Sequence, residues 1–308
     1  MKNDKTICIT EELISDCHEQ LVRSISVAEV AQALGLPKHE VLSSFETAVE
    51  ECRQTLSLLR NIELSVNARI LEVGAGYGLA SICLAMMQFE VTSLEPGGLG
   101  FEKNRSASLS LAESCGVRLN HLIHNAEDVD FSTLEKFDLV VSNNVLEHIS
   151  DVERALTNLN NAVSRHGIMI HSCANYSFPF EPHFGIPLLP GVPNLTSRIL
   201  PKSITQTGLW KSLNFIKLAQ VKRNVRRNGM ACVFRSGTMS KSVRRLQIDE
   251  KFAERHRFIS WIVSIPILFK FLILTTSLPK RIATPMDFLI CFPDSVGSSN
   301  VTRWKSEA

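Results

Sequence analysis

The sequence predicts an α/β fold in which a doubly wound, mostly parallel sheet is covered by helices on both faces. Two observations lead to this prediction. Short apolar runs alternate with helix-compatible segments between residues 66 and 175, and a glycine-rich turn directly follows the first run. Strands that alternate with helices at this spacing build parallel sheets. A strand, a glycine turn and a helix in succession form a nucleotide-type site at the carboxyl ends of such strands.

Seven segments carry the apolar pattern expected of strands. Five of them alternate with helix-compatible segments, so that we expect strands at 69–73, 90–95, 118–124, 137–142 and 167–173, and helices at 79–88, 100–115 and 150–165. A sixth strand at 229–235 and a final strand at 286–292 would complete the sheet. A basic helix is expected over 205–228.

Helices are also expected over residues 10–65, before the first strand of this alternation. Thr10 with the two glutamates after it predicts a capped helix start, and Ser26 with Glu29 has the form of a capping box. We interpret these helices as an N-terminal cap. Residues 27–41 faintly resemble a helix-turn-helix, which leaves a DNA-reading or dimerising element open, although two helices around a glycine turn are common in helical caps.

Composition indicates one large α/β domain with appendages, or two domains. The chain has 308 residues, of which 44% are hydrophobic, and its net charge is +2. Its eight cysteines contain no C-x-x-C pair, which argues against zinc ribbons and thioredoxin-like redox sites. Residues 1–20 are polar and show no signal-peptide pattern. A reducing, cytoplasmic compartment with free thiols is therefore expected.

The near-neutral total charge conceals an asymmetry. Residues 1–197 contain 13 Lys and Arg against 25 Asp and Glu, whereas residues 198–281 contain 18 against 3. An acidic body thus carries a basic segment, and we expect that segment to meet an anionic partner.

The glycine turn distinguishes between nucleotide-type cofactors. A dinucleotide fingerprint, G-x-G-x-x-G, would need glycine where Leu79 stands. The pattern from Glu72 to Gly78, E-x-G-x-G-x-G, instead resembles motif I of class I S-adenosylmethionine-dependent methyltransferases of the type 11/12-like group. The resemblance implies S-adenosylmethionine as cofactor and a Rossmann-like sheet whose last strand is antiparallel. It assigns the methionine and ribose portions of the cofactor to the following residues: Glu72, Gly74, Ala75, Gly76 and Gly78.

The ends of the next two strands extend this resemblance. Glu95 closes the second strand, 21 residues after Gly74, where a carboxylate can accept hydrogen bonds from both ribose hydroxyls. Pro96 follows it at the same edge. After the third strand, Asn125, Ala126 and Glu127 match the positions that present a side chain and a backbone N–H to the adenine in this family.

The segment after the fourth strand closely resembles a third motif of the same family, V-L-E-H. Here it reads Val145-Leu146-Glu147-His148, preceded by Asn143 and Asn144. The resemblance places both asparagines against the cofactor, and Glu147 and His148 at the rim of the methyl-transfer site. The alternative for His148 is a structural role in which it caps a helix or supports the loop. The segment does not resemble the N-P-P-Y motif of amino-directed DNA methyltransferases.

A proline-rich segment follows the fifth strand. Residues 175–203 hold six of the twelve prolines, which excludes regular helix and central strand. Residues 181–190 within it resemble a segment of methyltransferases from surface-glycan and lipid-linked saccharide pathways. His183, held between prolines near the expected acceptor side, is a candidate general base, and the alternative is a histidine that satisfies a loop carbonyl.

Residues 240–280 combine a basic stretch with an apolar one. Residues 258–278 are almost entirely apolar and have about the length of a membrane span, about 20 residues. Lys270 within the run argues against a span. A helix on an anionic bilayer surface and a buried or substrate-covering helix both remain open, so a peripheral location at the inner face of the membrane is one expectation.

The combined hypothesis is S-adenosylmethionine-dependent O-methylation of a small-molecule, glycan or lipid-linked acceptor. His148 or His183 would serve as general base, with Glu147 assisting, and no metal-ligand set is evident. An RNA methyltransferase and a non-catalytic cofactor-binding protein are the alternatives, although the basic segment lacks the interleaved aromatics typical of nucleic-acid binding.

The expected organisation is a cap at 1–65, a cofactor-binding core at 66–175, and substrate-covering and closing elements at 176–308. The oligomeric state is not predicted.

Overall fold

A sheet of seven strands forms the centre of the structure, a computed structural model that describes residues 5–96, 102–189, 191–248, 250–255, 260–261 and 283–306. Within these residues the strand order is β10-β11-β7-β6-β3-β4-β5. The strands are β3 (Arg69–Val73), β4 (Glu90–Glu95), β5 (Asn120–Ile123), β6 (Phe137–Asn143), β7 (Val163–Cys173), β10 (Ala231–Phe234) and β11 (Met286–Cys291). β11 runs antiparallel to both neighbours, and the other pairs are parallel. The predicted doubly wound, mostly parallel sheet with an antiparallel last strand is confirmed.

β3 lies in the middle of the sheet because both of its faces are apolar. Ile70 and Leu71 are fully buried and belong to apolar clusters on opposite faces. From β3 the chain proceeds outward through β4 to β5 and then returns to β6, on the other side of β3. Ligands of open α/β sheets bind in the crevice at the carboxyl ends of the strands where this direction reverses. The site is therefore expected above β3 and β6.

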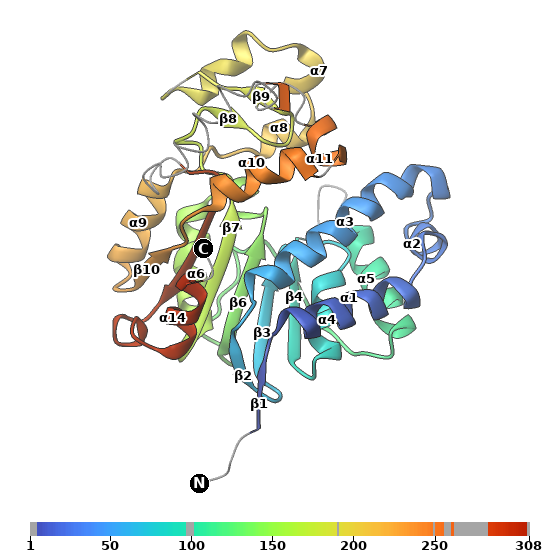
Figure 1. Cartoon of the computed structure of the whole chain (residues 1–308), viewed down its shortest axis with the longest axis vertical. Coiled ribbons are helices and arrows are strands. Elements are labelled where there is room, and N and C mark those ends of the chain that lie inside the picture. Colours follow the sequence, from blue (N-terminus) through green and yellow to red (C-terminus); the bar gives the residue numbers. More distant parts are fainter. Residues whose placement is uncertain are drawn as a thin grey trace.

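Helices cover both faces of the sheet (Figure 1). One face carries α4 (Leu79–Met86) and α5 (Glu102–Ser114), together with α14 (Ser299–Ser306), while the other carries α6 (Val152–Ala162) and α9 (Leu218–Arg227). Burial on both faces explains why the parallel strands read as continuous apolar runs and not as alternating patterns.

The N-terminal segment adds helices to the first of these faces. It comprises β1 (Thr6–Cys8), α1 (Glu11–Ser24), α2 (Val27–Leu34), α3 (Lys38–Leu58) and β2 (Glu63–Ser65). The Thr10 hydroxyl accepts from Leu13 N–H at 3.2 Å, and Ser26 with Glu29 forms the predicted capping box. The sequence pattern does not predict the antiparallel pairing of β1 with β2. α2 contacts both α3 and α5, so the segment at 27–41 that resembles a helix-turn-helix is part of the helical layer on this face.

The proline-rich segment forms a separate lobe above the carboxyl edge of the sheet (Figure 1). We call residues 175–212 the lobe. It contains the two-stranded β8 (Phe180–Glu181) and β9 (Ile186–Pro187), a 3-10 helix η2 (Pro193–Arg198), and two short helices, α7 (Lys202–Thr205) and α8 (Gly208–Ser212). Its lack of long regular elements agrees with the prediction from its prolines.

The single helix predicted over 205–228 is wrong, because the chain breaks between α8 and α9. Asn214 lies in this break, and its side-chain amide donates to the carbonyl oxygens of Leu146 and Ile149 at 2.7 and 2.8 Å. Phe215 next to it has a φ of 53°. Bonds to a distant loop and a left-handed residue are incompatible with a continuous helix.

The C-terminal region closes the sheet. After β10 come α10 (Thr238–Ile248) and α11 (Glu250–Arg255), and the apolar run predicted at 258–278 lies outside the described residues except for 260–261. Among the described residues no helix is long and apolar enough to cross a membrane. The eight cysteines are free thiols, as predicted.

Trp304 anchors the last helix to the rest of the protein. Its ring is fully buried, its indole N–H donates to the Leu58 carbonyl at 2.9 Å, and the Arg235 guanidinium lies 4.2 Å from the ring centroid. The C-terminal helix thus joins the end of α3 to the edge strand β10.

We expect Trp304→Ala to lower the free energy of unfolding by about 3–5 kcal/mol, because a large buried ring and its hydrogen bond are lost together. Trp304→Phe should lower it less, since most of the apolar volume stays. Trp261→Ala is the matched control, because that ring is 63% exposed. Chemical denaturation measures all three, and an equal loss in the control would contradict the anchoring role.

Candidate active site

The glycine loop after β3 has left-handed backbone at each of its three glycines. The φ angles of Gly74, Gly76 and Gly78 are 71°, 54° and 74°. A Cβ atom on Gly74 would collide with the Val145 side chain, and one on Gly78 with Ser108. A Cβ atom on Gly76 would meet no atom within 4 Å. The outer glycines therefore permit close packing of the loop, whereas Gly76 faces open space in which a ligand can lie against the backbone.

Glu95 contacts this loop directly. Its Oε2 accepts from the Gly76 N–H at 3.0 Å, and its Oε1 accepts from the Asn104 side chain at 3.1 Å. Burial raises the pKa of Glu95, and these two donors partly offset the rise. The structure thus brings together the two features that the sequence assigned to one cofactor, and each carboxylate oxygen keeps a lone pair for a ribose hydroxyl. Pro96 follows, half-buried, at the same edge.

Glu72 lies beneath the loop rather than in the open space. Its side chain is buried and accepts from the Ser81 hydroxyl at 2.5 Å, and Ser93 in turn donates to Ser81 at 2.8 Å. Burial raises the pKa of Glu72 to about 7, although the Ser81 hydrogen bond opposes the rise. Glu72 therefore joins β3 to the start of α4 and supports the loop from below.

The loop after β5 holds the residues expected at the adenine. Asn125 is exposed and donates to Asp128 at 2.9 Å. The Asn158 side chain, from α6, donates to the carbonyl oxygens of Ala126 and Glu127 at 3.1 and 2.9 Å. α6 thus fixes this loop from behind, and the Asn125 side chain stays at the surface.

Asn143 and Asn144 end β6 beside the glycine loop. The Asn143 side-chain nitrogen is buried and has no hydrogen-bond partner in the described part of the chain. Asn144 has a φ of 56°, its N–H donates to the Ser172 carbonyl at 2.9 Å, and its side chain approaches Glu51 at 3.4 Å. Both asparagines line a cleft of about 970 Å³.

This cleft lies over the carboxyl edge of β6 and β7, between α3 and α10. The lobe supplies part of its wall through Phe178, Phe180, Pro182 and His183, and Glu147 lines it from the sheet side. An acceptor in this space would contact the lobe and the end of β6 together. Two of the predicted catalytic residues, Glu147 and His183, therefore line a cavity large enough for a substrate, whereas His148 is not part of its lining.

His148 and His183 face one another at the rim of the cleft. Their Nε2 atoms are 3.3 Å apart, and the rings are in edge contact. The Nδ1 of His183 lies 2.6 Å from Glu181 Oε1, and the Nδ1 of His148 lies 2.8 Å from Ser212 Oγ. Glu181, the two imidazoles and Ser212 thus form one continuous chain of polar contacts.

The two imidazoles differ in proton affinity because Glu181 touches only one of them. Burial, together with the neighbouring His183, lowers the pKa of His148 to about 4. Burial also opposes protonation of His183, but the hydrogen bond and charge of Glu181 outweigh it, and the pKa of His183 is raised. The same contact holds the pKa of Glu181 below its ordinary value against the effect of burial. Near neutral pH, His148 is uncharged.

Glu147 connects the sheet with the lobe. Its side chain is 1% exposed, Oε1 accepts from the Ala174 N–H at 3.2 Å, and the backbone carbonyl accepts from the Asn214 N–H at 2.9 Å. Oε2 is buried and without a hydrogen-bond partner among the described residues. Burial raises the pKa of Glu147 to about 7.

The rim also contains a group that could hold a metal ion. Glu147, His148 and His183 bring one ligand atom each to within 4.8 Å of one another. Imidazole nitrogens with a carboxylate oxygen suit zinc and other first-row divalent ions. The sequence spacing does not show this set, because His183 stands 35 residues beyond His148 and the lobe brings it back.

Three contributors to the rim were not predicted from the sequence. Glu181 was predictable in principle, because a carboxylate two residues before a candidate base in a rigid proline frame can reach its ring. Tyr176, whose hydroxyl donates to Glu181 at 3.2 Å, and Ser212 had no such signal.

Comparisons with known proteins agree with this geometry. Residues 45–240 match a family model described as a methyltransferase domain. The chain belongs to this methyltransferase family. With the family pattern of sheet, glycine loop and Glu95, it is a class I enzyme that uses S-adenosylmethionine, so the predicted family, enzyme class and cofactor are confirmed.

Three similar proteins illustrate the range of relatives. An uncharacterized protein of Mycobacterium tuberculosis is 32% identical over 209 residues, 65% of this methyltransferase and 70% of that protein. The ubiquinone biosynthesis O-methyltransferase of Azorhizobium caulinodans is 35% identical over 107 residues, 35% of this chain and 40% of that one. The solved structure of phosphoethanolamine N-methyltransferase 2 from Haemonchus contortus, in complex with S-adenosyl-L-methionine, is 12% identical with a TM-score of 0.47, over 80% of this chain and 51% of that one.

Glu72→Gln should raise the free energy of unfolding at pH 8 by on the order of 3 kcal/mol. A carboxyl with a raised pKa contributes stability that is complete below its ordinary value of 4.5 and is lost as the pH rises through about 7. The neutral amide avoids that loss, so the two proteins should differ much less at pH 5. Urea denaturation at both pH values measures the difference.

The control is Glu113→Gln, on the exposed side of α5. It should show no pH-dependent gain. A Glu72→Gln variant that is equally stable relative to the parent at pH 5 and pH 8 would show that Glu72 is not held neutral by its surroundings.

Proposed function

We propose that this methyltransferase methylates a hydroxyl oxygen of a small-molecule, glycan or lipid-linked acceptor, with His183 as general base. The observation that carries the proposal is the contact of His183 with the buried carboxylate of Glu181, at a cleft that Asn143, Asn144 and Glu147 also line. A hydroxyl must lose its proton to attack efficiently, and a histidine oriented by a carboxylate is suited to take it.

The residues that would hold the cofactor form the second half of the site. Gly76 and Glu95 would receive the ribose, Gly74, Ala75 and Gly78 would shape the loop around the methionine, and the open space at Gly76 fits such a ligand. The remaining assignments are the following: Glu72 supporting the loop, Pro96 at the same edge, Asn125, Ala126 and Glu127 at the adenine, and Asn143 and Asn144 at the β6 end. When bound, S-adenosylmethionine supplies an electrophilic methyl group.

The proton steps fall to the histidine pair. In its deprotonated form His183 accepts the hydroxyl proton at Nε2, and Glu181 at Nδ1 stabilises the imidazolium that results. His148, whose pKa is about 4, stays neutral, and its Nε2 can accept a hydrogen bond from the Nε2–H of protonated His183 across 3.3 Å. Glu147 assists by fixing the start of the lobe through Ala174.

The acceptor class is supported by two resemblances. Ubiquinone biosynthesis O-methyltransferases are among the relatives, and an acceptor with a phenolic or other hydroxyl is consistent with a histidine base. Residues 181–190 resemble the glycan and lipid-linked saccharide enzymes. The expected contact of residues 240–280 with an anionic membrane stays a prediction, because most of its apolar part lies outside the described residues.

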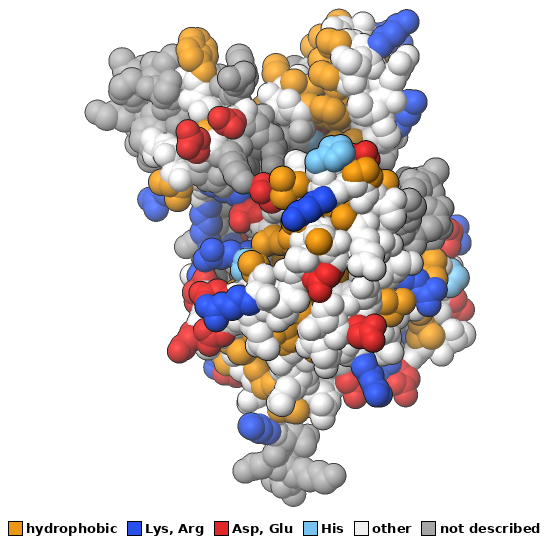
Figure 2. Space-filling view, turned by 90° about the vertical axis from the view of Figure 1, so that its right-hand side faces the viewer, with side chains coloured by type: hydrophobic (Ala, Val, Ile, Leu, Met, Phe, Trp, Pro, Cys, Tyr) orange, Lys and Arg blue, Asp and Glu red, His pale blue; other side chains and the backbone are white. Residues whose placement is uncertain are grey.

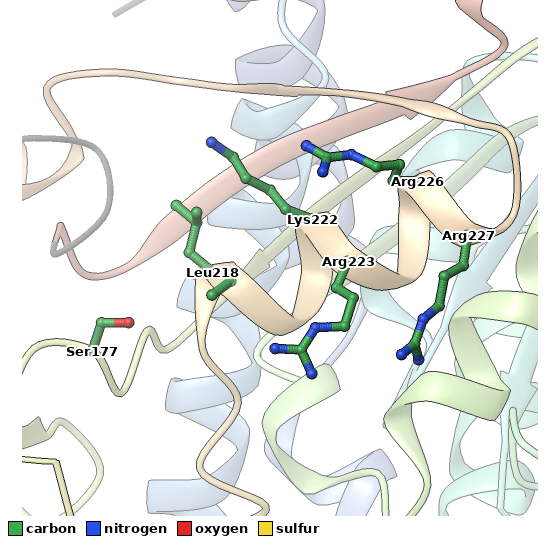
Figure 3. A pocket seen from close by; sticks show the side chains of 7 residues that line it. Ser177, Leu218, Lys222, Arg223, Arg226 and Arg227 are labelled. Carbon is green, nitrogen blue, oxygen red and sulfur yellow. The ribbon is translucent and has the colours of Figure 1, made fainter.

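One observation favours the alternative of an RNA substrate. Lys222, Arg223, Arg226 and Arg227 project from α9 around a shallow pocket (Figure 3). Only Arg227 among these has an acidic partner within the described residues, Glu153 at 3.4 Å. RNA binding through this helix would weaken steeply with salt. However, α9 packs against α6 on one face of the sheet, and it contains no aromatic residue that could form a platform for bases.

Glu95→Ala should weaken the binding of S-adenosylmethionine by about tenfold to a hundredfold, because two hydrogen bonds to a charged acceptor are lost. Isothermal titration calorimetry with S-adenosylmethionine measures this, and NAD should give no heat with the parent protein. Glu90→Ala, at the exposed opposite end of the same strand, is the control. Unchanged affinity in Glu95→Ala would remove Glu95 from the ribose site.

His183→Gln should reduce kcat by about 10²–10⁴-fold and leave cofactor affinity nearly unchanged, because it removes the base but no cofactor contact. The control is His166→Gln, which alters an exposed histidine of β7. Methylated product is measured with a catechol or polyprenylphenol probe. Loss of activity under EDTA with recovery on adding zinc or manganese would show that the rim holds a metal and that His183 is not the base.

The pH profile tests the role of Glu181. In the parent protein kcat/KM should rise as the pH passes through the raised pKa of His183, which lies above the ordinary 6.5. In Glu181→Gln the burial of His183 is no longer outweighed, so this acidic limb should move to lower pH while the maximal rate falls. An acidic limb that stays in place would assign it to another group.

A further inference from the structure

The lobe carries apolar side chains on its outer surface. Five large aliphatic residues in the lobe are between 37% and 70% exposed: Leu189, Val192, Leu195, Ile199 and Leu209. Figure 2 shows hydrophobic side chains gathered at the top of the molecule, where the lobe lies in Figure 1. Single exposed aliphatic residues are ordinary on protein surfaces, but a concentration of them on one projecting element indicates a contact surface.

Positive charge accompanies these side chains. Arg198, Lys202 and Lys211 lie among the aliphatic residues in sequence, and Lys and Arg side chains stand at the edge of the lobe in Figure 2. None of the three has an ion-pair partner in the described part of the chain. From residue 182 to residue 248 the sequence contains 12 Lys and Arg and no Asp or Glu. The only carboxylate of the lobe, Glu181, is buried, so the outer surface of the lobe carries aliphatic and basic side chains but no acidic one.

The shape of this surface favours a lipid bilayer over a peptide or protein partner. Val192, Leu195 and Ile199 flank or belong to η2, a 3-10 helix of six residues, and Leu189 and Leu209 extend from neighbouring segments. Separate aliphatic residues on short elements offer no groove in which a peptide helix or strand could lie. A fluid bilayer does not require a groove, because each aliphatic side chain can enter the acyl boundary separately while the Lys and Arg side chains contact the headgroups.

We propose that the lobe docks on a bilayer that contains anionic lipid, so that the enzyme takes its acceptor from the membrane surface. The same lobe contributes Phe178, Phe180 and Pro182 to the wall of the cleft. An apolar acceptor that leaves the bilayer at the lobe would therefore enter beside His183. This surface differs from residues 240–280, and its docking requires neither the hydroxyl acceptor nor the histidine base of the proposed function.

Vesicle flotation with the full chain tests the proposal. Vesicles of phosphatidylcholine alone should carry little protein, whereas an equimolar mixture with phosphatidylglycerol should carry most of it, because each Lys or Arg near an anionic surface contributes about 1 kcal/mol. Arg198→Gln/Lys202→Gln/Lys211→Gln should weaken binding about a hundredfold. Val192→Ser/Ile199→Ser should weaken it about tenfold or more.

Matched controls keep the result interpretable. Arg23→Gln/Lys38→Gln/Arg118→Gln removes the same charge from exposed positions outside the lobe. Leu134→Ser/Val296→Ser removes exposed aliphatic residues at the amino edge of the parallel strands, away from the lobe. Both controls should float like the parent. Calorimetry with S-adenosylmethionine confirms that each variant is folded, and methyl transfer is not needed for the readout.

Three outcomes would overturn the proposal. The first is parent protein that stays unbound with both vesicles. The second is vesicle binding that survives both lobe variants or falls equally in the controls, which would assign it to another segment or to net charge. The third is salt-sensitive binding of the same lobe to transfer RNA without vesicle binding.

Discussion

The hydrogen bond from the Gly76 N–H to Glu95 is the contact on which the proposed cofactor side of this methyltransferase depends. It joins the turn after β3 to the end of β4, and it forms only because those strands are parallel neighbours whose carboxyl ends meet. Positive φ at the turn directs the amide toward the carboxylate, and the missing Cβ leaves the space above it open. Glu72, buried against Ser81, supports the turn from the opposite side. The loop is thus fixed from two directions before any ligand binds, which lowers the entropic cost of binding.

The acceptor side depends on a second connection, which runs through the segment after β6. The backbone of this segment accepts three hydrogen bonds from Asn214, and the Glu147 carboxylate accepts one from Ala174. Ala174 and Asn214 lie just before and just after the lobe in sequence. The residues that follow β6 therefore fix the lobe at both of its ends. This explains how a lobe of short elements can hold His183 within 3.3 Å of His148. Here the V-L-E-H motif has a structural role as well as the chemical one expected of it.

Local sequence signals were sufficient to predict the sheet and the proximity of the glycine loop to Glu95. Continuous apolar runs gave the strands, since burial on both faces removes any alternation, and Thr10 and Ser26 gave the helix starts through contacts three residues away. The break after α8 was not predictable, because it arises from Asn214 reaching a loop 65 residues earlier, and helix propensity contains no information on that contact. The contact of Ser212 with His148 was not predictable for the same reason, since the two residues lie 64 positions apart in the sequence. The ligand atoms of Glu147, His148 and His183 converge only after the lobe has folded back, which no spacing rule anticipates.

The histidine pair shows why such convergence matters for chemistry. Two imidazoles with the same ordinary pKa of 6.5, both half-buried, have their pKa values shifted in opposite directions because one carboxylate touches only one of them. Without Glu181, burial would lower the pKa of both imidazoles. The lobe supplies the carboxylate, the proposed base and the proposed docking surface together, from Glu181 through Leu209. Movement of the lobe would carry the Glu181–His183 contact with it, but it would change the contact of His183 with His148 and the opening of the cleft at the same time. A surface that orders the lobe would act on both, and this coupling gives a physical reason for the proposed base and the proposed docking surface to lie on the same lobe.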